Sequence, residues 1–261
     1  MFQVPKIVHN KLFKVGVIIS AFLIVVACIV LGFWFTTRAL FSKNPHFVLK
    51  YVAVESTGWW QSKSADIIEI LKLKINESNI FEANLLELRK KLEKEPSIEK
   101  VSISRILPDT LRFSISERIP RAYLDSRKSL LVVDSSGMVM LRNSCLNINP
   151  KLPVIADYET KVEIKPGMMM PQLKPAMELI MLTHTDYPEF RIFVVSMKNT
   201  DELEFILFYE DDKLKPYRVY MHTTDIPSKL NVLKSALIRA LRSNDPRRTI
   251  NLTFDGSVVF N

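Results

Sequence analysis

The hydrophobic positions of the chain form one long uninterrupted run and many short alternating ones. The long run, Val15 to Thr37, contains 23 residues and no charged side chain. At about 1.5 Å per residue, a helix of this length measures roughly 35 Å and exceeds the roughly 30 Å hydrocarbon core of a bilayer. A cleaved signal peptide has a shorter apolar region of about 7 to 15 residues. The pattern therefore predicts a transmembrane helix over 15–37 behind a tail of residues 1–14.

The charges beside this run predict its direction across the membrane. Cations flank the run on both sides, with Lys6, Lys11 and Lys14 before it and Arg38 and Lys43 after it. Positive charge tends to stay on the cytoplasmic side of a membrane helix, so three cations before the run against two after it favour a cytoplasmic N-terminus. The tail of 14 residues is also too short to hold a folded domain. We therefore expect a cytoplasmic N-terminus, a single pass through the plasma (inner) membrane, and residues 44–261 on its extracytoplasmic side.

Residues 44–119 have the pattern of two amphipathic helices on a small sheet. The expected elements are a strand over 47–55, helices beginning at Ser64 and covering 82–94, and strands over 101–105 and 111–116. Pro108 and Asp109 between the last two strands are typical of a turn. The predicted order is therefore β-α-α-β-β.

Residues 120–261 form a second, strand-rich module. The expected elements are strands over 123–124, 130–134 and 139–141, a helix over 172–184, strands over 190–197, 203–209 and 217–222, a helix capped by Thr224 or Asp225 with Pro227 in its first turn, and a hairpin of 249–254 with 257–260. Asp134 to Gly137 and Asp255-Gly256 supply the turns. The fold class predicted for the whole chain is α+β.

Two stretches of the chain contain recognisable motifs. They are Pro108-Asp109-Thr110-Leu111 continued by Glu117-Arg118-x-Pro120-x-Ala122, and Val132-Val133-Asp134-x-x-Gly137-x-Val139. These motifs and the β-α-α-β-β order resemble the FtsQ/DivIB family of bacterial cell-division proteins. The resemblance implies a POTRA domain over 44–119 and a C-terminal β domain over 120–261. It also implies a non-enzymatic scaffold of the divisome at the division septum, linking early and late division proteins and controlling septal peptidoglycan synthesis.

The last predicted strand is expected at the edge of a sheet. It contains none of the Lys, Pro or bulge features that protect natural edges, which suggests that a partner strand pairs with it. In the resembled family these strands receive a small FtsB/DivIC-type protein that docks with an FtsL-type protein. The resemblance implies this role for Thr253, Phe254, Ser257, Val258, Val259 and Phe260. The alternative is that Val258 and Phe260 simply face the core.

One feature of the terminal strands departs from the resembled family. Asn251-Leu252-Thr253 stands where many relatives carry Asp-Leu-Arg, so a contact made by that arginine is missing.

A second candidate surface is the loop Gly58-Trp59-Trp60, because exposed aromatic residues mark interaction sites. The alternative for Trp59 and Trp60 is that they are ordinary buried anchors.

Composition argues against catalysis and against nucleic acid as a partner. The net charge is +8, and residues 1–43 contribute five cations and no acid, so residues 44–261 carry only +3, mostly interspersed with acids. No nucleophile, base and orienting group belong together, and the four histidines stand apart. Glu117 and Asp134 are better explained as hairpin framework than as paired catalytic carboxylates. We therefore expect no enzyme activity, cofactor, metal or small-molecule substrate.

Two other classes of function stay open at this stage. A POTRA-containing assembly or secretion factor would bind the strands of client proteins, although such factors usually carry several POTRA copies and a β-barrel. A membrane-anchored sensor would need an apolar pocket with converging polar groups.

Overall fold

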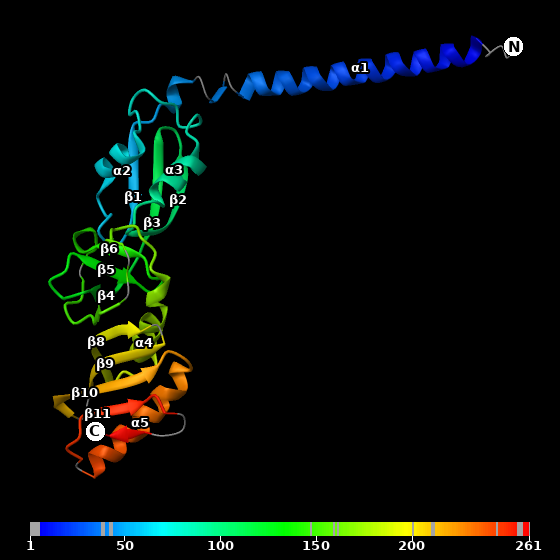
Figure 1. Ribbon diagram of the computed structural model, residues 1–261. Helices are drawn as coiled ribbons and strands as arrows, with labels where there is room; N and C mark the ends of the chain where they lie inside the picture. Colours follow the sequence, from blue (N-terminus) through cyan, green and yellow to red (C-terminus); the bar gives the residue numbers. More distant parts are fainter. Residues whose placement is uncertain are drawn as a thin grey trace. The chain divides into compact units, whose positions relative to one another are not determined.

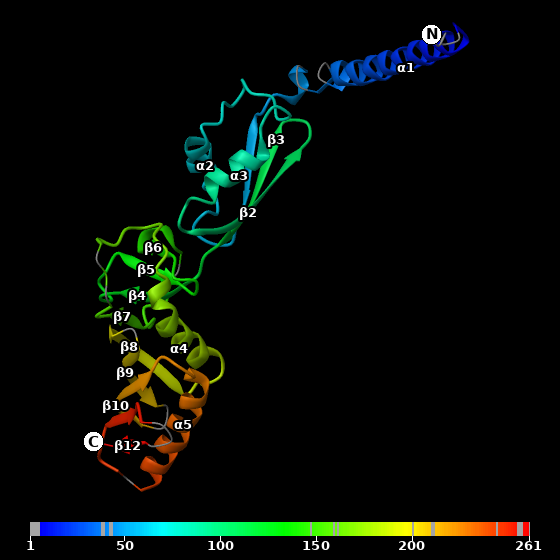
Figure 2. The ribbon, with the colours of Figure 1, turned by 45° about the vertical axis from the view of Figure 1, so that its right-hand side comes forward.

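The structure, a computed structural model, describes residues 6–37, 40–41, 44–146, 148–158, 160, 162–199, 201–209, 212–243, 245–254 and 258–260. Figures 1 and 2 show the chain in two views. Its contacts define two compact units. One comprises Met1–Ala53, Ser64–Arg89 and Ile103–Phe113, and the other comprises Val54–Lys63, Lys90–Ser102 and Ser114–Asn261. The expected boundary between domains 44–119 and 120–261 stays a prediction.

The first helix is the apolar run predicted from the sequence. Helix α1 covers Lys6–Thr37, and its stretch Lys14–Thr36 has a mean hydropathy of 3.0 with every side chain exposed. The hydroxyls of Ser20 and Thr36 donate to carbonyls of the helix itself, at 2.9 Å to Val17 O and 2.9 Å to Gly32 O. These polar groups are thus satisfied without water. The helix is long and apolar enough to cross a membrane, whereas the direction of crossing stays a prediction.

The next elements follow the expected β-α-α-β-β order. They are β1 (Tyr51–Glu55), α2 (Ser64–Leu71), α3 (Leu85–Leu92), β2 (Ile98–Ile106) and β3 (Thr110–Glu117). The sheet order is β1-β3-β2, so β1 lies at an edge. The expected strand over 47–55 is too long: its start belongs to the 3-10 helix η2 (Pro45–Phe47). Pro45 fixes a φ suited to the first helical turn, and the Asn44 side chain accepts from His46 N at 2.9 Å.

The remaining strands form one nine-stranded sheet. They are β4 (Pro120–Leu124), β5 (Leu131–Asp134), β6 (Val139–Leu141), β7 (Val154–Ala156), β8 (Phe190–Asn199), β9 (Glu202–Tyr209), β10 (Asp212–His222), β11 (Thr249–Leu252) and β12 (Val259–Phe260). Their order is β12-β11-β10-β9-β8-β7-β4-β5-β6. Most neighbours are antiparallel, but β7 pairs in parallel with β4 and β8, and β11 pairs in parallel with β10. The expected α+β class is confirmed.

Two helices provide the crossovers for two of these parallel pairs, β7 with β8 and β10 with β11. Helix α4 (Lys174–Thr185) lies between β7 and β8 in sequence, and α5 (Ile226–Arg242) lies between β10 and β11. Both helices share one buried cluster with the strands, and Figures 1 and 2 show α5 alongside β10 and β11. A smaller cluster around Tyr123, Val132 and Met140 packs on the opposite face, because adjacent strand residues point to opposite faces.

One expected helix cap is wrong. Asp225 precedes α5 in a left-handed conformation at φ 51°, and its side chain makes no capping hydrogen bond. Instead Lys229 Nζ donates to the Thr224 carbonyl at 2.8 Å and holds the chain entering the helix. Pro227 lies in the first turn as expected, and the apolar stripe of Leu230, Leu233 and Leu237 is buried.

Candidate functional site

Strand β12 forms one edge of the nine-stranded sheet. It pairs antiparallel with β11 through Ile250 opposite Phe260 and Asn251 opposite Val259. Its other side has no neighbouring strand among the described residues. In an antiparallel edge strand, alternate residues direct their N–H and C=O groups outward. The expected terminal hairpin and edge position are therefore present, and Ser257 lies outside the described residues.

The side chains at this edge divide between the core and the surface. Val258 and Phe260 are half-buried and pack against the buried cluster that α4 and α5 share with the strands. This agrees with the alternative that these two side chains face the core. Val259 is 37% exposed and Phe254 is 56% exposed. A partner at this edge would therefore meet open backbone groups, with Val259 and Phe254 as the apolar side chains within reach.

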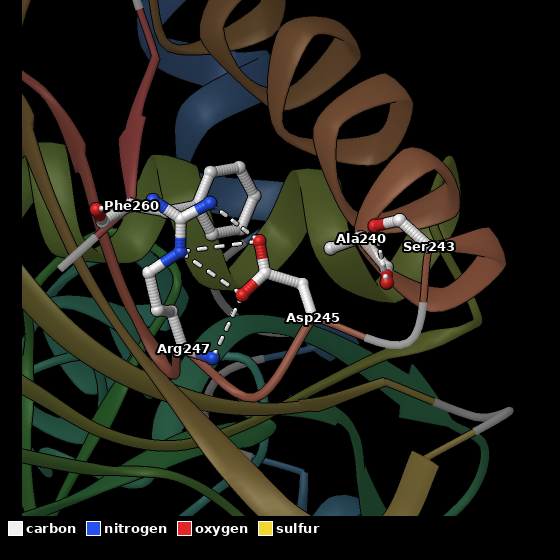
Figure 3. A network of polar contacts seen from close by, with 5 residues as sticks. All are labelled: Ala240, Ser243, Asp245, Arg247 and Phe260. Carbon is white, nitrogen blue, oxygen red and sulfur yellow. Dashed lines mark hydrogen bonds and ion pairs between the residues drawn. The ribbon is translucent and has the colours of Figure 1, made fainter.

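Arg247 links the end of β12 to the loop before β11, and it also forms a salt bridge with Asp245 of the same loop (Figure 3). Arg247 Nη2 lies 2.6 Å from Asp245 Oδ2, and Arg247 Nη1 donates to the Phe260 carbonyl at 3.2 Å. The same guanidinium lies over the Phe260 ring at 5.5 Å. Hydrogen bonds from Arg247 lower the pKa of Asp245 to about 2. The edge strand is thus positioned by a cation that also neutralises a nearby carboxylate.

Asn251 and Thr253 adopt a local turn at the end of β11. Thr253 N and Thr253 Oγ1 donate to Asn251 Oδ1 at 2.8 and 2.7 Å. The two polar side chains of Asn251-Leu252-Thr253 therefore hydrogen-bond to each other. The Thr253 hydroxyl is thus already hydrogen-bonded within this chain.

The loop with the two tryptophans is organised around a carboxylate. Glu117 accepts from Trp59 N at 2.8 Å, from Trp60 N at 2.8 Å, and from the Ser56 hydroxyl. The expectation that both rings are exposed is wrong for Trp60, which is 3% exposed and donates from Nε1 to Ser97 Oγ at 3.0 Å. Trp60 is buried because its indole N–H finds a partner there. Trp59 is partly exposed, with Lys63 Nζ 4.6 Å from its ring, and its role as a partner surface stays a prediction.

Gly58 permits the close approach of this loop to Glu117. A Cβ atom at position 58 would lie 2.2 Å from Glu117 Oε2, far inside van der Waals contact. A side chain at position 58 would therefore displace the carboxylate from the three donors that it accepts from.

Arg118 and Asp134 form an ion pair between the second motif and the first. Arg118 Nη1 lies 2.8 Å from Asp134 Oδ2, with the side chains 16% and 7% exposed. Asp134 also accepts from Ser136 N and Met138 N at 2.9 Å each. Burial acts to raise the pKa of Asp134, but hydrogen bonds from Ser136, Arg118 and Met138 outweigh it, so the pKa lies below its ordinary value of 3.8.

This lowered pKa predicts a loss of stability in acid. Because Asp134 binds protons more weakly in the folded chain, its contribution to the free energy of unfolding is fully present above its ordinary pKa of 3.8 and is lost as the pH falls through the folded-state pKa. The urea midpoint of the unchanged protein should fall as the pH is lowered from about 5 to about 3. We expect this fall to be smaller in Asp134→Asn, because asparagine cannot titrate. Equal slopes for the two proteins would contradict the assignment.

A cavity of about 310 Å³ opens between β4, the segment 146–153, α4 and β8. Apolar side chains including Leu152 and Ile192 line it together with Arg121, Lys151 and Arg191, and none of its described lining residues is acidic. The sensor hypothesis requires a pocket of this kind, but what the cavity takes stays a prediction. Within the described part of the chain, no group of three or more His, Cys, Asp or Glu residues is placed to hold a metal.

Comparisons with known proteins agree with the motifs. The family model for the POTRA domain of FtsQ type matches residues 49–118. The cell division protein DivIB of Clostridium acetobutylicum is 26% identical over 220 residues, which is 84% of each chain. DivIB of Clostridium tetani is 31% identical over 98 residues, or 38% of this chain and 36% of that one. The cell division protein FtsQ of Koribacter versatilis is 27% identical over 128 residues, or 49% of this chain and 35% of that one.

The family model covers the segment that follows the apolar helix. The helix is followed by a POTRA domain and a mixed sheet with helices, and the matched region ends at Arg118, inside the motif that contains Glu117. The relatives that match are named as cell-division proteins. The chain therefore contains a POTRA domain of FtsQ type and is similar, over 84% of its length, to a cell-division protein named DivIB.

Proposed function

We propose that this protein is a non-enzymatic, single-pass scaffold of the divisome that captures a partner strand at β12. The partner would be an FtsB/DivIC-type protein docked with an FtsL-type protein, and its capture would control septal peptidoglycan synthesis. In this proposal the N-terminus is cytoplasmic, the folded part is extracytoplasmic, and the protein gathers at the septum, where it links early and late division proteins.

The single observation that supports capture at this edge is its open position. The strand ends the sheet order, and Val258 to Phe260 contain no proline or lysine. Backbone hydrogen bonds to an added strand would supply affinity, and alternate side chains would supply selectivity. Because Val258 and Phe260 already pack on the core, selectivity falls to Val259 and Phe254.

A crosslinking experiment tests this proposal in cells. A photoreactive residue replaces Phe254 or Val259, which are exposed, and the captured species are identified by mass. We expect a small single-span protein with a coiled-coil pattern. A control substitution at Val232, which is 46% exposed on α5, should not capture it. Capture of many unrelated unfolded chains would instead favour the assembly-factor alternative.

A substitution at the edge should weaken partner binding without unfolding the sheet. We expect Val259→Lys to reduce affinity for the purified partner complex by about tenfold or more, since charged edge residues oppose strand addition. Val259→Thr keeps the shape and β-propensity of the side chain and serves as the control. Binding of the lysine variant at the original affinity by a folded protein would exclude this edge as the contact.

A further inference from the structure

Three phenylalanine rings cluster where the chain leaves helix α1. Phe41 lies 6.0 Å from Phe47 and 5.1 Å from Phe81 between ring centroids, and Phe47 lies 5.0 Å from Phe81. Phe41 is 41% exposed, and the adjacent Leu40 is 61% exposed. Phe47 and Phe81 are partly exposed. We call Phe41, Phe47 and Phe81 the aromatic cluster. It joins residues directly after the helix to a loop 34 or more positions away in sequence.

Hydrogen bonds fix the cluster to the folded unit that contains it. The buried Asn79 donates from Nδ2 to the carbonyls of Phe41 and Asn44, at 2.9 and 3.2 Å. Ile80 N donates to the Phe47 carbonyl at 2.9 Å. The loop that carries Phe81 therefore cannot move far from Phe41 without breaking buried hydrogen bonds.

A cation stands beside the cluster. Arg105 lies over the Phe81 ring at 5.6 Å and donates to the carbonyls of Ile80 and Ala83, at 2.7 and 2.8 Å. The sequence adds Arg38 and Lys43 within a few residues of Phe41. Aromatic rings with neighbouring cations are the side chains that membrane–water interfaces favour.

Covalent geometry limits the distance between the cluster and the membrane. Phe41 follows the last residue of the apolar stretch, Thr36, by five positions, so even a fully extended chain separates the two by at most about 17 Å. The headgroup layer extends roughly 5 to 7 Å beyond the hydrocarbon core on each side. With Thr36 at the edge of the hydrocarbon core, a spanning α1 therefore keeps Phe41 no more than about 10 to 12 Å beyond the headgroups, and the two rings packed on it stay close by.

We propose that the aromatic cluster seats this folded unit on the lipid surface that its own helix crosses. Phe41 and Leu40 enter the interface, and Phe81 brings the 79–83 loop down with them. This contact, which we call the seat, restricts the orientation of the unit that contains α2 and the aromatic cluster relative to the bilayer. This inference rests on α1 spanning a membrane, which is part of the proposed function, but it does not depend on partner capture at β12.

The test compares how close Phe81 lies to the lipid headgroups with how accessible it is to bulk water. The full chain is reconstituted in lipid nanodiscs with 4-trifluoromethylphenylalanine at position 81, and the fluorine signal is recorded with gadolinium either chelated to lipid headgroups or dissolved as a neutral chelate. We expect the headgroup-bound gadolinium to broaden the signal more than the dissolved chelate does. Stronger broadening by the dissolved chelate would overturn the proposal, and so would protection from both reagents, which would indicate a protein cover.

A second probe separates failure of the seat from failure of the span. The same amino acid at Phe22, in the middle of the apolar stretch, should be shielded from the dissolved chelate if α1 crosses the bilayer. A shielded Phe22 with a solvent-facing Phe81 would reject the seat alone. An accessible Phe22 would reject both the seat and the membrane part of the proposed function.

Substitution of the exposed ring tests what holds the seat. With the probe at position 81, Phe41→Ser should abolish the excess broadening by headgroup gadolinium, whereas Phe41→Leu, which stays apolar, should keep it. Because Phe41 is exposed, the serine variant should remain folded, which the amide spectrum of the extramembrane part checks. Unchanged broadening in the serine variant would show that Phe41 packs only within the domain and would overturn the proposal.

Discussion

We expect Glu117→Ala to lower the free energy of unfolding by about 2 to 4 kcal/mol, because hydrogen bonds to a charged acceptor contribute roughly 1.5 to 3 kcal/mol each without being additive. The substitution leaves Trp59 N, Trp60 N and the Ser56 hydroxyl without their acceptor. Urea unfolding of the full chain in detergent, followed by tryptophan fluorescence, measures the effect.

Two matched variants show whether the carboxylate itself is responsible. Glu117→Gln keeps the length of the side chain and one acceptor oxygen, so it should cost less than Glu117→Ala. Gly58→Ala should approach the alanine variant in effect, since its Cβ would lie 2.2 Å from Glu117 Oε2 and push the carboxylate aside. A Glu117→Ala protein with an unchanged urea midpoint would show that water satisfies the loop equally well.

Residues that alternate or recur over many positions were predictable from the sequence. The apolar stretch of α1 follows from its length and hydropathy. The β-α-α-β-β order and helices α4 and α5 follow from periodicity, because these elements bury one face. The terminal hairpin followed from its strand pattern, and β12 lies at the edge of the sheet as expected. The strand pattern does not reveal whether a partner strand pairs with this edge.

The features that the sequence did not reveal depend on distant residues. Strand β7 has three residues, too few for a period to be recognised. Its parallel pairing with β8 depends on the crossover by α4, and its parallel pairing with β4 depends on the connection that contains β5 and β6. Trp60 looks like an exposed loop residue until Ser97 and Glu117 are placed beside it. Its adjacency to Trp59 gave no signal of burial.

In the motif that contains Glu117 and Arg118, both side chains make structural contacts. Glu117 holds the loop of residues 56–60, and Arg118 holds the turn that begins at Asp134. Arg118 N also donates to the Ser97 carbonyl at 2.9 Å, next to the hydroxyl that binds Trp60. Two consecutive side chains thus fasten loops from separate parts of one compact unit, and neither needs a catalytic role to explain it.

We expect Asp134→Ala to lower the free energy of unfolding by about 3 to 5 kcal/mol, the usual cost of removing one partner from a buried ion pair. The variant leaves the half-buried Arg118 cation without its carboxylate and removes the acceptor for Ser136 N and Met138 N. Arg118→Ala alone should cost less, about 2 to 3 kcal/mol, because Asp134 keeps its other donors.

The double variant determines how much of this cost is the unpaired charge. Removing Arg118 together with Asp134 eliminates the buried cation that Asp134→Ala strands, so the double variant should be more stable than the sum of the two single effects predicts. Thermal unfolding at pH 7 in the same detergent measures all three proteins. Strict additivity would mean that the carboxylate acts through the turn of residues 134–138 alone, and that the ion pair adds nothing to the attachment of the motif.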